Sequence, residues 1–333
     1  MASSSTDSIA VLASELTDTI AVKYFYLSNA VILYYDTLLN LREDVKYIWM
    51  SRWSLGKCLY ILSRYLAFVD LTLLLVYTFD SRLRPSQCLP LYKASAWFQV
   101  AGVIFAELIL IVRTYAIYQR SRPMLCYLIA LHLGLTLPSL NIINRSFAFI
   151  SYGPSPAPTI IPCVPTIGDV RWWIPFMCIA IFDLNIVTLT LWKAVMDWRS
   201  GATRTEFIIT LYRDGFMYFA GMFATSLTNV ILMKVMRQTP YFLLFVGWQR
   251  LLHALLSARL IINVRRASLG AWLNSTADPH CDTSKCIATT TTKLALSLDF
   301  TEPMELRYLP QYKDSEVSYH GEETNEPYAE KGV

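Results

Sequence analysis

Long apolar stretches separated by short polar segments dominate residues 20–266 of the chain. A helix needs about 20 mainly apolar residues to cross the roughly 30 Å hydrocarbon layer of a bilayer. Because an open sheet would leave backbone groups without hydrogen bonds in lipid, helices are expected rather than strands. The pattern predicts seven membrane-spanning helices, at Ile20–Leu41, Leu55–Phe79, Ala96–Tyr118, Met124–Ile143, Trp172–Val195, Phe207–Leu232 and Tyr241–Ile262.

Two polar segments flank this seven-helix domain. Residues 1–19 are rich in Ser and Thr and are expected to form a polar extracellular N-terminus. Residues 267–333 have more acidic than basic side chains and are rich in Ser, Thr and Tyr, and we expect this segment to be a disordered cytoplasmic tail. The predicted fold class is therefore all-α, a polytopic seven-transmembrane-helix bundle with a disordered C-terminal tail.

The composition agrees with a membrane protein. The chain is 54% hydrophobic and only 16% charged, whereas a soluble domain has about 25% charged residues. No basic run with interleaved aromatic residues indicates a nucleic-acid surface. Membrane lipids are the expected partners, and nucleic acids are not.

The distribution of Lys and Arg predicts an orientation. With the N-terminus outside, more basic residues fall in the inner segments than in the outer ones, as the positive-inside rule requires. We expect an integral protein of the plasma membrane, with the N-terminus outside and the C-terminus in the cytoplasm.

Two cysteines fall on the predicted outer side. Cys88 precedes the third span, and Cys163 lies in the proline-rich segment Asn144–Arg171, which we expect to form a stiff outer lid. The oxidising outer face favours a disulfide between them. The alternative is two unpaired thiols, since the sequence alone does not fix their separation.

Ionisable residues lie inside the predicted spans, where an unpaired charge is costly. Six of them form a candidate intramembrane polar site: Arg64, Asp70, Glu107, Asp183, Arg250 and His253. At a rise of about 1.5 Å per residue, the two aspartates, Glu107 and Arg250 fall near one level of the bilayer. Arg64 lies deeper and is expected to reach Asp36 or Asp70. The set is either a polar functional site or a group of structural pairs that lock the helices together.

Several segments together resemble a known family. They include Tyr35-Asp36 followed by Arg42-Glu43-Asp44-Val45, then Arg64-Tyr65, Arg213-Asp214-Gly215 and Ser257-Ala258-Arg259. The chain resembles the seven-helix membrane proteins of mushroom-forming fungi that carry domain of unknown function 6533, which would cover residues 24–70. The resemblance implies a multi-pass membrane protein. It implies no activity and identifies no catalytic residues.

The polar residues of these motifs lie near the predicted inner face. They predict a cytoplasmic-side charge lattice made of Asp36, Arg42, Glu43, Asp44, Arg113, Arg213 and Asp214. Arg64 of the second span would join this lattice to the first span.

Enzymatic chemistry has no candidate residues. The chain lacks a P-loop, a Gly-x-Ser-x-Gly turn and a His-Glu-x-x-His motif. The last span has no Lys for a Schiff base, and the spans contain too few His for a zinc hydrolase. We predict no catalytic residues, no metal and no cofactor, and thus not an enzyme.

Two functional hypotheses remain. The first is a receptor-like protein that binds a small-molecule ligand from outside and contacts a cytoplasmic signalling partner through its inner loops and tail. The second is a transporter or an ion or proton pathway through the mid-membrane residues. Against the second, the sequence shows no inverted repeat.

Overall fold

The computed structural model describes residues 2–51, 53–153, 155, 157, 161–167, 171–199, 206–236 and 239–277. These residues form seven long α-helices, three short helical turns and one small hairpin. The long helices are α1 (Ala2–Asp44), α2 (Leu55–Phe79), α3 (Pro85–Ile117), α4 (Arg122–Ser146), α5 (Trp173–Arg199), α6 (Glu206–Val235) and α7 (Leu244–Ala277). The π-helical turn η1 (Val45–Trp49) follows α1, and the 3₁₀ turns η2 (Phe147–Phe149) and η3 (Pro240–Leu243) follow α4 and α6.

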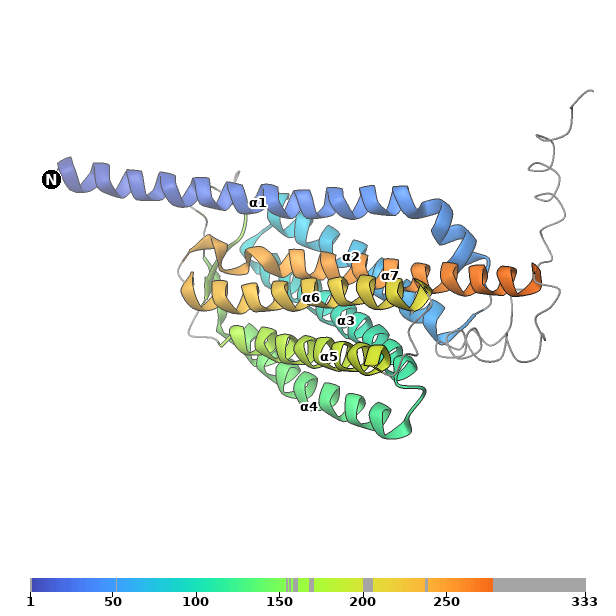
Figure 1. Cartoon of the computed structure of the whole chain (residues 1–333). Coiled ribbons are helices and arrows are strands. Elements are labelled where there is room, and N and C mark those ends of the chain that lie inside the picture. The colour runs from blue at the N-terminus through green and yellow to red at the C-terminus, as the bar shows by residue number, and fades with distance from the viewer. Residues whose placement is uncertain are drawn as a thin grey trace, which may run out of the picture. The chain divides into compact units, whose positions relative to one another are not determined.

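Successive helices run in opposite directions, so the bundle has two ends (Figure 1). The strands β1 (Ile150–Gly153) and β2 (Val164–Ile167) lie at one end, which we call the hairpin end. The connections from α1 to α2 and from α3 to α4 lie at the other end, called here the opposite end, as do the C-terminus of α5 and the N-terminus of α6. In the bundle α2 packs against α3 and α7, α5 against α4 and α6, and α1 against α2 and α7.

Several helices have the length and composition of membrane spans. Among the described residues, five qualify: Leu55–Phe79, Pro85–Ile117, Arg122–Phe149, Trp173–Arg199 and Tyr218–Val235. The chain is thus an all-α, multi-pass integral membrane protein. Only five of the seven expected spans meet this criterion of length and hydropathy. The other two, α1 and α7, contain charged and polar residues that lower their mean hydropathy.

Three helix ends differ from the sequence prediction. The polar N-terminal residues are helical, because α1 already begins at Ala2. The third helix begins at Pro85 rather than Ala96, since a proline at the first helical position needs no amide hydrogen bond. The last helix extends to Ala277, so residues 267–277 of the expected disordered tail are helical. The rest of that tail lies outside the described residues.

The segment between α4 and α5 is more structured than the expected extended lid. Strands β1 and β2 pair antiparallel, with Ile150 opposite Ile167, and the hairpin contacts α3. The Tyr152 hydroxyl lies 3.2 Å from the Tyr77 hydroxyl of α2, and burial raises the pKa of Tyr152. Pro154, Pro156 and Pro158 lie outside the described residues.

A disulfide joins Cys163, just before β2, to Cys88 in the first turns of α3. The two Cα atoms are 5.9 Å apart, and both cysteines are buried. The bond therefore ties the hairpin to the N-terminal end of α3.

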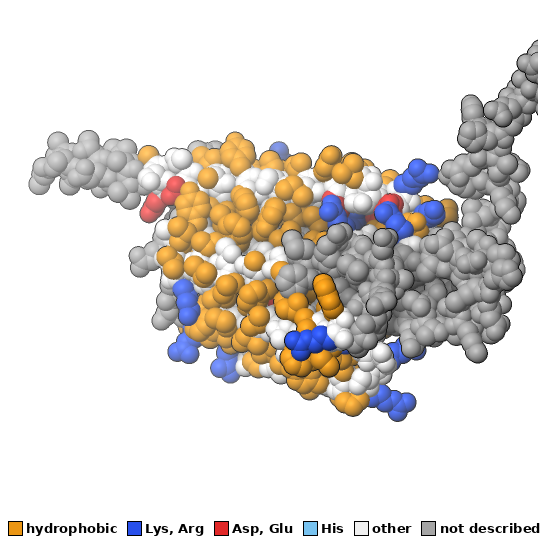
Figure 2. All heavy atoms as spheres, in the orientation of Figure 1, with side chains coloured by type: hydrophobic (Ala, Val, Ile, Leu, Met, Phe, Trp, Pro, Cys, Tyr) orange, Lys and Arg blue, Asp and Glu red, His pale blue; other side chains and the backbone are white. Residues whose placement is uncertain are grey.

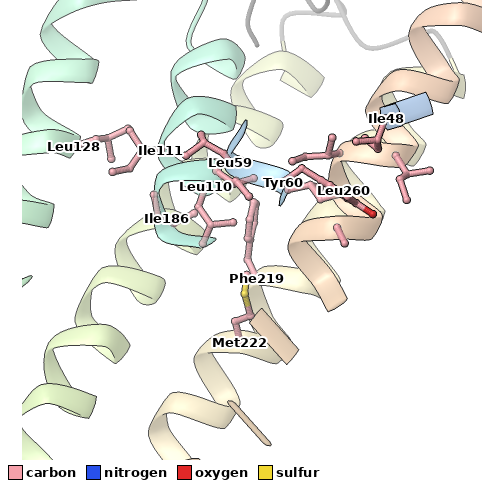
Figure 3. Close-up of a cluster of buried hydrophobic side chains, with 14 of the residues drawn as sticks. Ile48, Leu59, Tyr60, Leu110, Ile111, Leu128, Ile186, Phe219, Met222 and Leu260 are labelled. Atoms are coloured by element: carbon pink, nitrogen blue, oxygen red, sulfur yellow. The ribbon is translucent and has the colours of Figure 1, made fainter. Parts of the chain in front are cut away.

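A large cluster of buried apolar residues fills the bundle toward the opposite end. Figure 3 shows several of its members pointing toward one another from different helices. This apolar cluster consists of Tyr47, Ile48, Leu59, Tyr60, Ile109, Leu110, Ile111, Leu128, Phe182, Ile186, Phe219, Met222, Ala258, Leu260, Ile261 and Ile262.

Apolar side chains also cover the outside of the helices. Figure 2 shows hydrophobic side chains spread over the described face in view. Leu38, Leu137 and Trp192 are each at least 60% exposed. A surface of this kind is suited to contact with lipid tails.

Replacing Cys163 with Ser should release the hairpin from α3. Because the disulfide links residues separated by 75 positions, its loss should lower the stability by about 4 kcal/mol. Gel mobility with and without reductant and thermal unfolding of the purified protein measure both effects. Cys126→Ser, at an exposed free thiol, is the control. An unchanged response to reductant in Cys163→Ser would contradict the assigned pairing.

Candidate functional site

A buried ion pair joins α2 and α7 at the centre of the bundle. Arg250 Nε donates to Asp70 Oδ2 at 2.7 Å, and Arg250 Nη2 donates to the backbone oxygen of Ser63 at 2.9 Å. Both side chains are at most 3% exposed. The backbone oxygen of Asp70 in turn accepts from Ser95 Oγ of α3, so the pair connects three helices.

Gly102 of α3 makes room for the guanidinium group of Arg250. A Cβ atom at position 102 would overlap the Arg250 Nη2, Cζ and Nε atoms. The guanidinium group is held in place by Asp70 and Ser63, so it cannot move away without losing hydrogen bonds. The absence of a side chain at Gly102 is therefore a condition for the ion pair.

A hydrogen-bonded chain of side chains links α5, α6 and α7 next to this pair. Ser226 Oγ donates to Asp183 Oδ2 at 2.7 Å, and Gln249 Nε2 donates to Ser226 Oγ at 2.9 Å. Asn229 Nδ2 donates to Gln249 Oε1 at 2.5 Å. Because Gln249 adjoins Arg250 on α7, this chain places Asp183 in the same region of the bundle as the ion pair.

Glu107 of α3 has a histidine as its partner. His132 Nδ1 of α4 lies 3.3 Å from Glu107 Oε2, and the imidazole ring packs against Phe182 at 5.3 Å between ring centroids. His253 lies about one turn beyond Arg250 and is fully buried. In the described part of the chain, neither of its ring nitrogens has a hydrogen-bond partner.

We call this set of residues the polar layer. It comprises Asp70, Glu107, His132, Asp183, Ser226, Asn229, Gln249, Arg250 and His253. The polar layer thus contains five of the six residues of the candidate intramembrane site.

A cavity of about 110 Å³ lies between α3, α4, α5 and α7 on the hairpin side of the polar layer. Most of its wall is apolar, with Val103, Leu135 and Phe176 as examples. Its polar wall includes Glu107, His132, Gln249 and Arg250. An apolar chamber with a few polar groups at one end is the usual form of a small-molecule site.

The sixth predicted residue, Arg64, belongs to a different cluster. Its Nη2 atom lies 3.4 Å from Asp36 Oδ2 and 3.5 Å from Asp44 Oδ2. The expectation that it reaches Asp36 is met, whereas Asp70 is occupied by Arg250. Tyr60 completes this cluster by donating to Asp44 Oδ1 at 2.6 Å.

Arginines of α7 extend the cluster at the opposite end. Arg259 Nη2 lies 2.5 Å from Asp36 Oδ1, so Asp36 contacts arginines of both α2 and α7. Arg266 pairs with Glu43. Arg265 donates to the backbone oxygen of Tyr47 in η1. We call this set, made of Asp36, Glu43, Asp44, Arg64, Arg259, Arg265 and Arg266, the arginine network.

The arginine network includes three of the seven residues of the predicted charge lattice. Arg42 is exposed. Arg113 is buried, and its guanidinium carbon lies 5.0 Å from the ring centre of Phe219. Arg213 and Asp214 lie in α6, but their side chains are outside the described part of the structure.

Sequence analysis missed most of the uncharged members of the polar layer. His132, Ser226, Asn229 and Gln249 are single polar residues in apolar stretches and carry no motif. A usable signal was present in α6, because Ser226 and Asn229 are spaced by three residues and so share one helix face. The α7 arginines were missed as network members because they were counted only for orientation.

Replacing Gly102 with Ala should disrupt the Arg250–Asp70 pair. The added methyl group overlaps a guanidinium group held by two hydrogen bonds to α2, and such overpacking costs about 1–3 kcal/mol. We expect a lower melting temperature in detergent. Gly134→Ala in α4 is the matched control, because a Cβ atom there meets no atom within 4 Å; it should be neutral or slightly stabilising. Equal behaviour of the two variants would refute the role assigned to Gly102.

One comparison with known proteins gave a match. Residues 24–69 match a family of unknown function, DUF6533. This segment runs from α1 into α2 and contains Asp36, Glu43, Asp44 and Arg64 of the arginine network. No curated protein and no solved structure matches the chain. The match agrees with the resemblance noted above over nearly the same residues and assigns no activity.

Proposed function

We propose that the chain is a receptor-like plasma-membrane protein with seven spans, an outer N-terminus and a cytoplasmic C-terminus. It binds a small-molecule ligand in the cavity between α3, α4, α5 and α7. The observation that carries this proposal is the apolar cavity whose wall includes Arg250, the buried arginine of α7.

Internal pairing supports a membrane-spanning position for α1 and α7. The charged residues of α7 that lower its hydropathy have partners within the bundle: Arg250 pairs with Asp70, and Arg259 with Asp36. Asp36, the central acid of α1, is only 3% exposed. Charges that face the bundle interior and are paired are the ones tolerated at membrane depth.

The position of α7 supports coupling between the cavity and the opposite end. Gln249 and Arg250 contribute to the cavity wall. Arg259, Arg265 and Arg266 of the same helix contact α1 and η1. A ligand that changes the position of Arg250 would therefore act on a helix whose far end holds the arginine network together.

The position of the apolar cluster favours ligand binding over the passage of ions or protons. Ile109 follows Glu107 by two residues in α3, and Ile186 follows Asp183 by three in α5. Both lie on the opposite-end side of the polar layer, where the apolar cluster fills the bundle. An ion or proton pathway would have to cross this cluster, which makes the transporter hypothesis the weaker of the two.

Filling the cavity should abolish ligand binding. Val103 is part of the cavity wall, so Val103→Trp should block it, whereas Val69→Trp adds the same group at a position that is 41% exposed. We expect compounds from a panel of small apolar molecules to raise the melting temperature of the parent protein and of Val69→Trp, but not of Val103→Trp. Compounds that stabilise all three proteins equally, or none that stabilise the parent, would refute the proposed site.

Epitope tags decide the number and direction of the spans. We place one tag before Ala2, one after Val333 and one between Arg199 and Glu206. With seven spans, the C-terminal tag and the central tag share the cytoplasmic side, and only the N-terminal tag is accessible on intact cells. With only the five apolar spans, the central tag would instead share its side with the N-terminal tag.

A further inference from the structure

We propose that Arg42 and Lys46 bind the anionic headgroup of a phospholipid whose acyl chains lie along the outward face of α1. This inference rests on the membrane-spanning position of α1 in the proposed function and does not depend on the cavity. Its basis is an exposed face of α1 that changes from apolar to basic side chains toward the opposite end.

One face of α1 and η1 is exposed over several turns. Its residues recur every three or four positions, the spacing that places side chains on one face of a helix. We call this face the α1 stripe, and it consists of Val31, Tyr35, Leu38, Arg42, Lys46 and Met50. The first three are between 59% and 69% exposed. On a membrane-spanning helix, apolar side chains this exposed are suited to contact with lipid tails.

The α1 stripe becomes basic where α1 ends. Arg42 lies in the last turn of α1, and Lys46 lies in the turn η1 that follows. At 1.5 Å per residue, Val31 and Arg42 are about 16 Å apart along the helix, roughly half of the hydrocarbon thickness. Trp49 and Trp53 come next and are exposed, as is typical of the membrane–water interface. The two basic side chains therefore lie at the level of lipid headgroups.

The acidic side chains near Arg42 and Lys46 are occupied by other arginines. Each pairs with an arginine of α2 or α7, and the acids are Asp36, Glu43 and Asp44. Within the described residues, no acidic side chain lies within ion-pair distance of Arg42 or Lys46. The Lys46 ammonium group lies 5.3 Å from the ring centre of Tyr47, which adds no counter-charge. Both exposed cations are thus available to an anion from outside the chain.

This end of α1 and α7 has an excess of positive charge. Arg42, Lys46 and the arginine network together contain six basic and three acidic side chains. Arg259 and Arg266 are 49% and 52% exposed, so part of this charge reaches the surface. Figure 2 shows basic side chains gathered where α1 and α7 reach the opposite end. Basic side chains beside a span attract anionic lipids, whereas a zwitterionic headgroup brings no net charge to balance them.

Competition between two phospholipids tests this proposal. The full-length chain in detergent is mixed with equal amounts of phosphatidylserine and phosphatidylcholine that have the same acyl chains, and bound lipids are counted by native mass spectrometry. A basic residue at the headgroup favours an anionic lipid about fivefold, so the pair should favour phosphatidylserine about thirtyfold. The double variant Arg42→Gln/Lys46→Gln should lose most of this preference. Both positions are exposed, so the substitutions should not affect folding.

The double variant Arg120→Gln/Arg122→Gln is the matched control. It removes two exposed basic side chains at the same end of the bundle, in the connection from α3 to α4 and at the start of α4. Its preference for phosphatidylserine should equal that of the parent. An equal loss in both double variants would reveal a general effect of charge and overturn the assigned site, as would a parent protein without any preference.

Glycerophosphoserine distinguishes a lipid site from a site for a free anion. This water-soluble compound has the headgroup without the acyl chains. Because the chains are expected to lie along the α1 stripe, an excess of glycerophosphoserine should not displace phosphatidylserine; full displacement would overturn the lipid assignment. Val103→Trp, which fills the cavity, should keep the parent's lipid preference. Failure of the cavity proposal and failure of this inference are therefore separate results.

Discussion

The structure depends on how a charge can be buried within lipid. An arginine at membrane depth is tolerated only when its charge and its hydrogen-bond donors are taken up by other parts of the protein. Here Asp70 and the Ser63 backbone oxygen do so for Arg250. Because those groups lie on α2, while the required space lies beside Gly102 on α3, one side chain of α7 fixes the relative positions of three helices.

The same constraint explains the arrangement along the bundle axis. The buried carboxyl groups of the described helices lie in two regions, the polar layer and the arginine network, where each has an arginine, histidine or serine side chain as its partner. Between the polar layer and the opposite end, α3 to α6 contribute the apolar cluster. Asp36 contacts both Arg64 and Arg259, so removal of one arginine would still leave its charge partly balanced.

Much of the architecture could be predicted from the sequence. The length of an apolar stretch and the free-energy cost of burying a charge can both be judged from a short segment of the chain. Asp70 and Arg250 were assigned to one level of the bilayer by counting residues along helices of opposite direction. Counting could not give the rotation of each helix about its axis, which decides that Asp70 meets Arg250 and that Arg64 meets Asp36. Gly102 carried no signal at all, since its importance arises from a side chain 148 positions away. The helical start of α1 was missed because a polar segment in water has no apolar pattern to reveal it.

A purely structural role for the polar layer leaves the cavity beside it unexplained. Arg250, Glu107 and His132 are part of the wall of a space of about 110 Å³. Filling that space with an apolar side chain would have stabilised the bundle more simply. A cavity retained beside these polar residues is therefore better explained by a ligand than by the needs of packing.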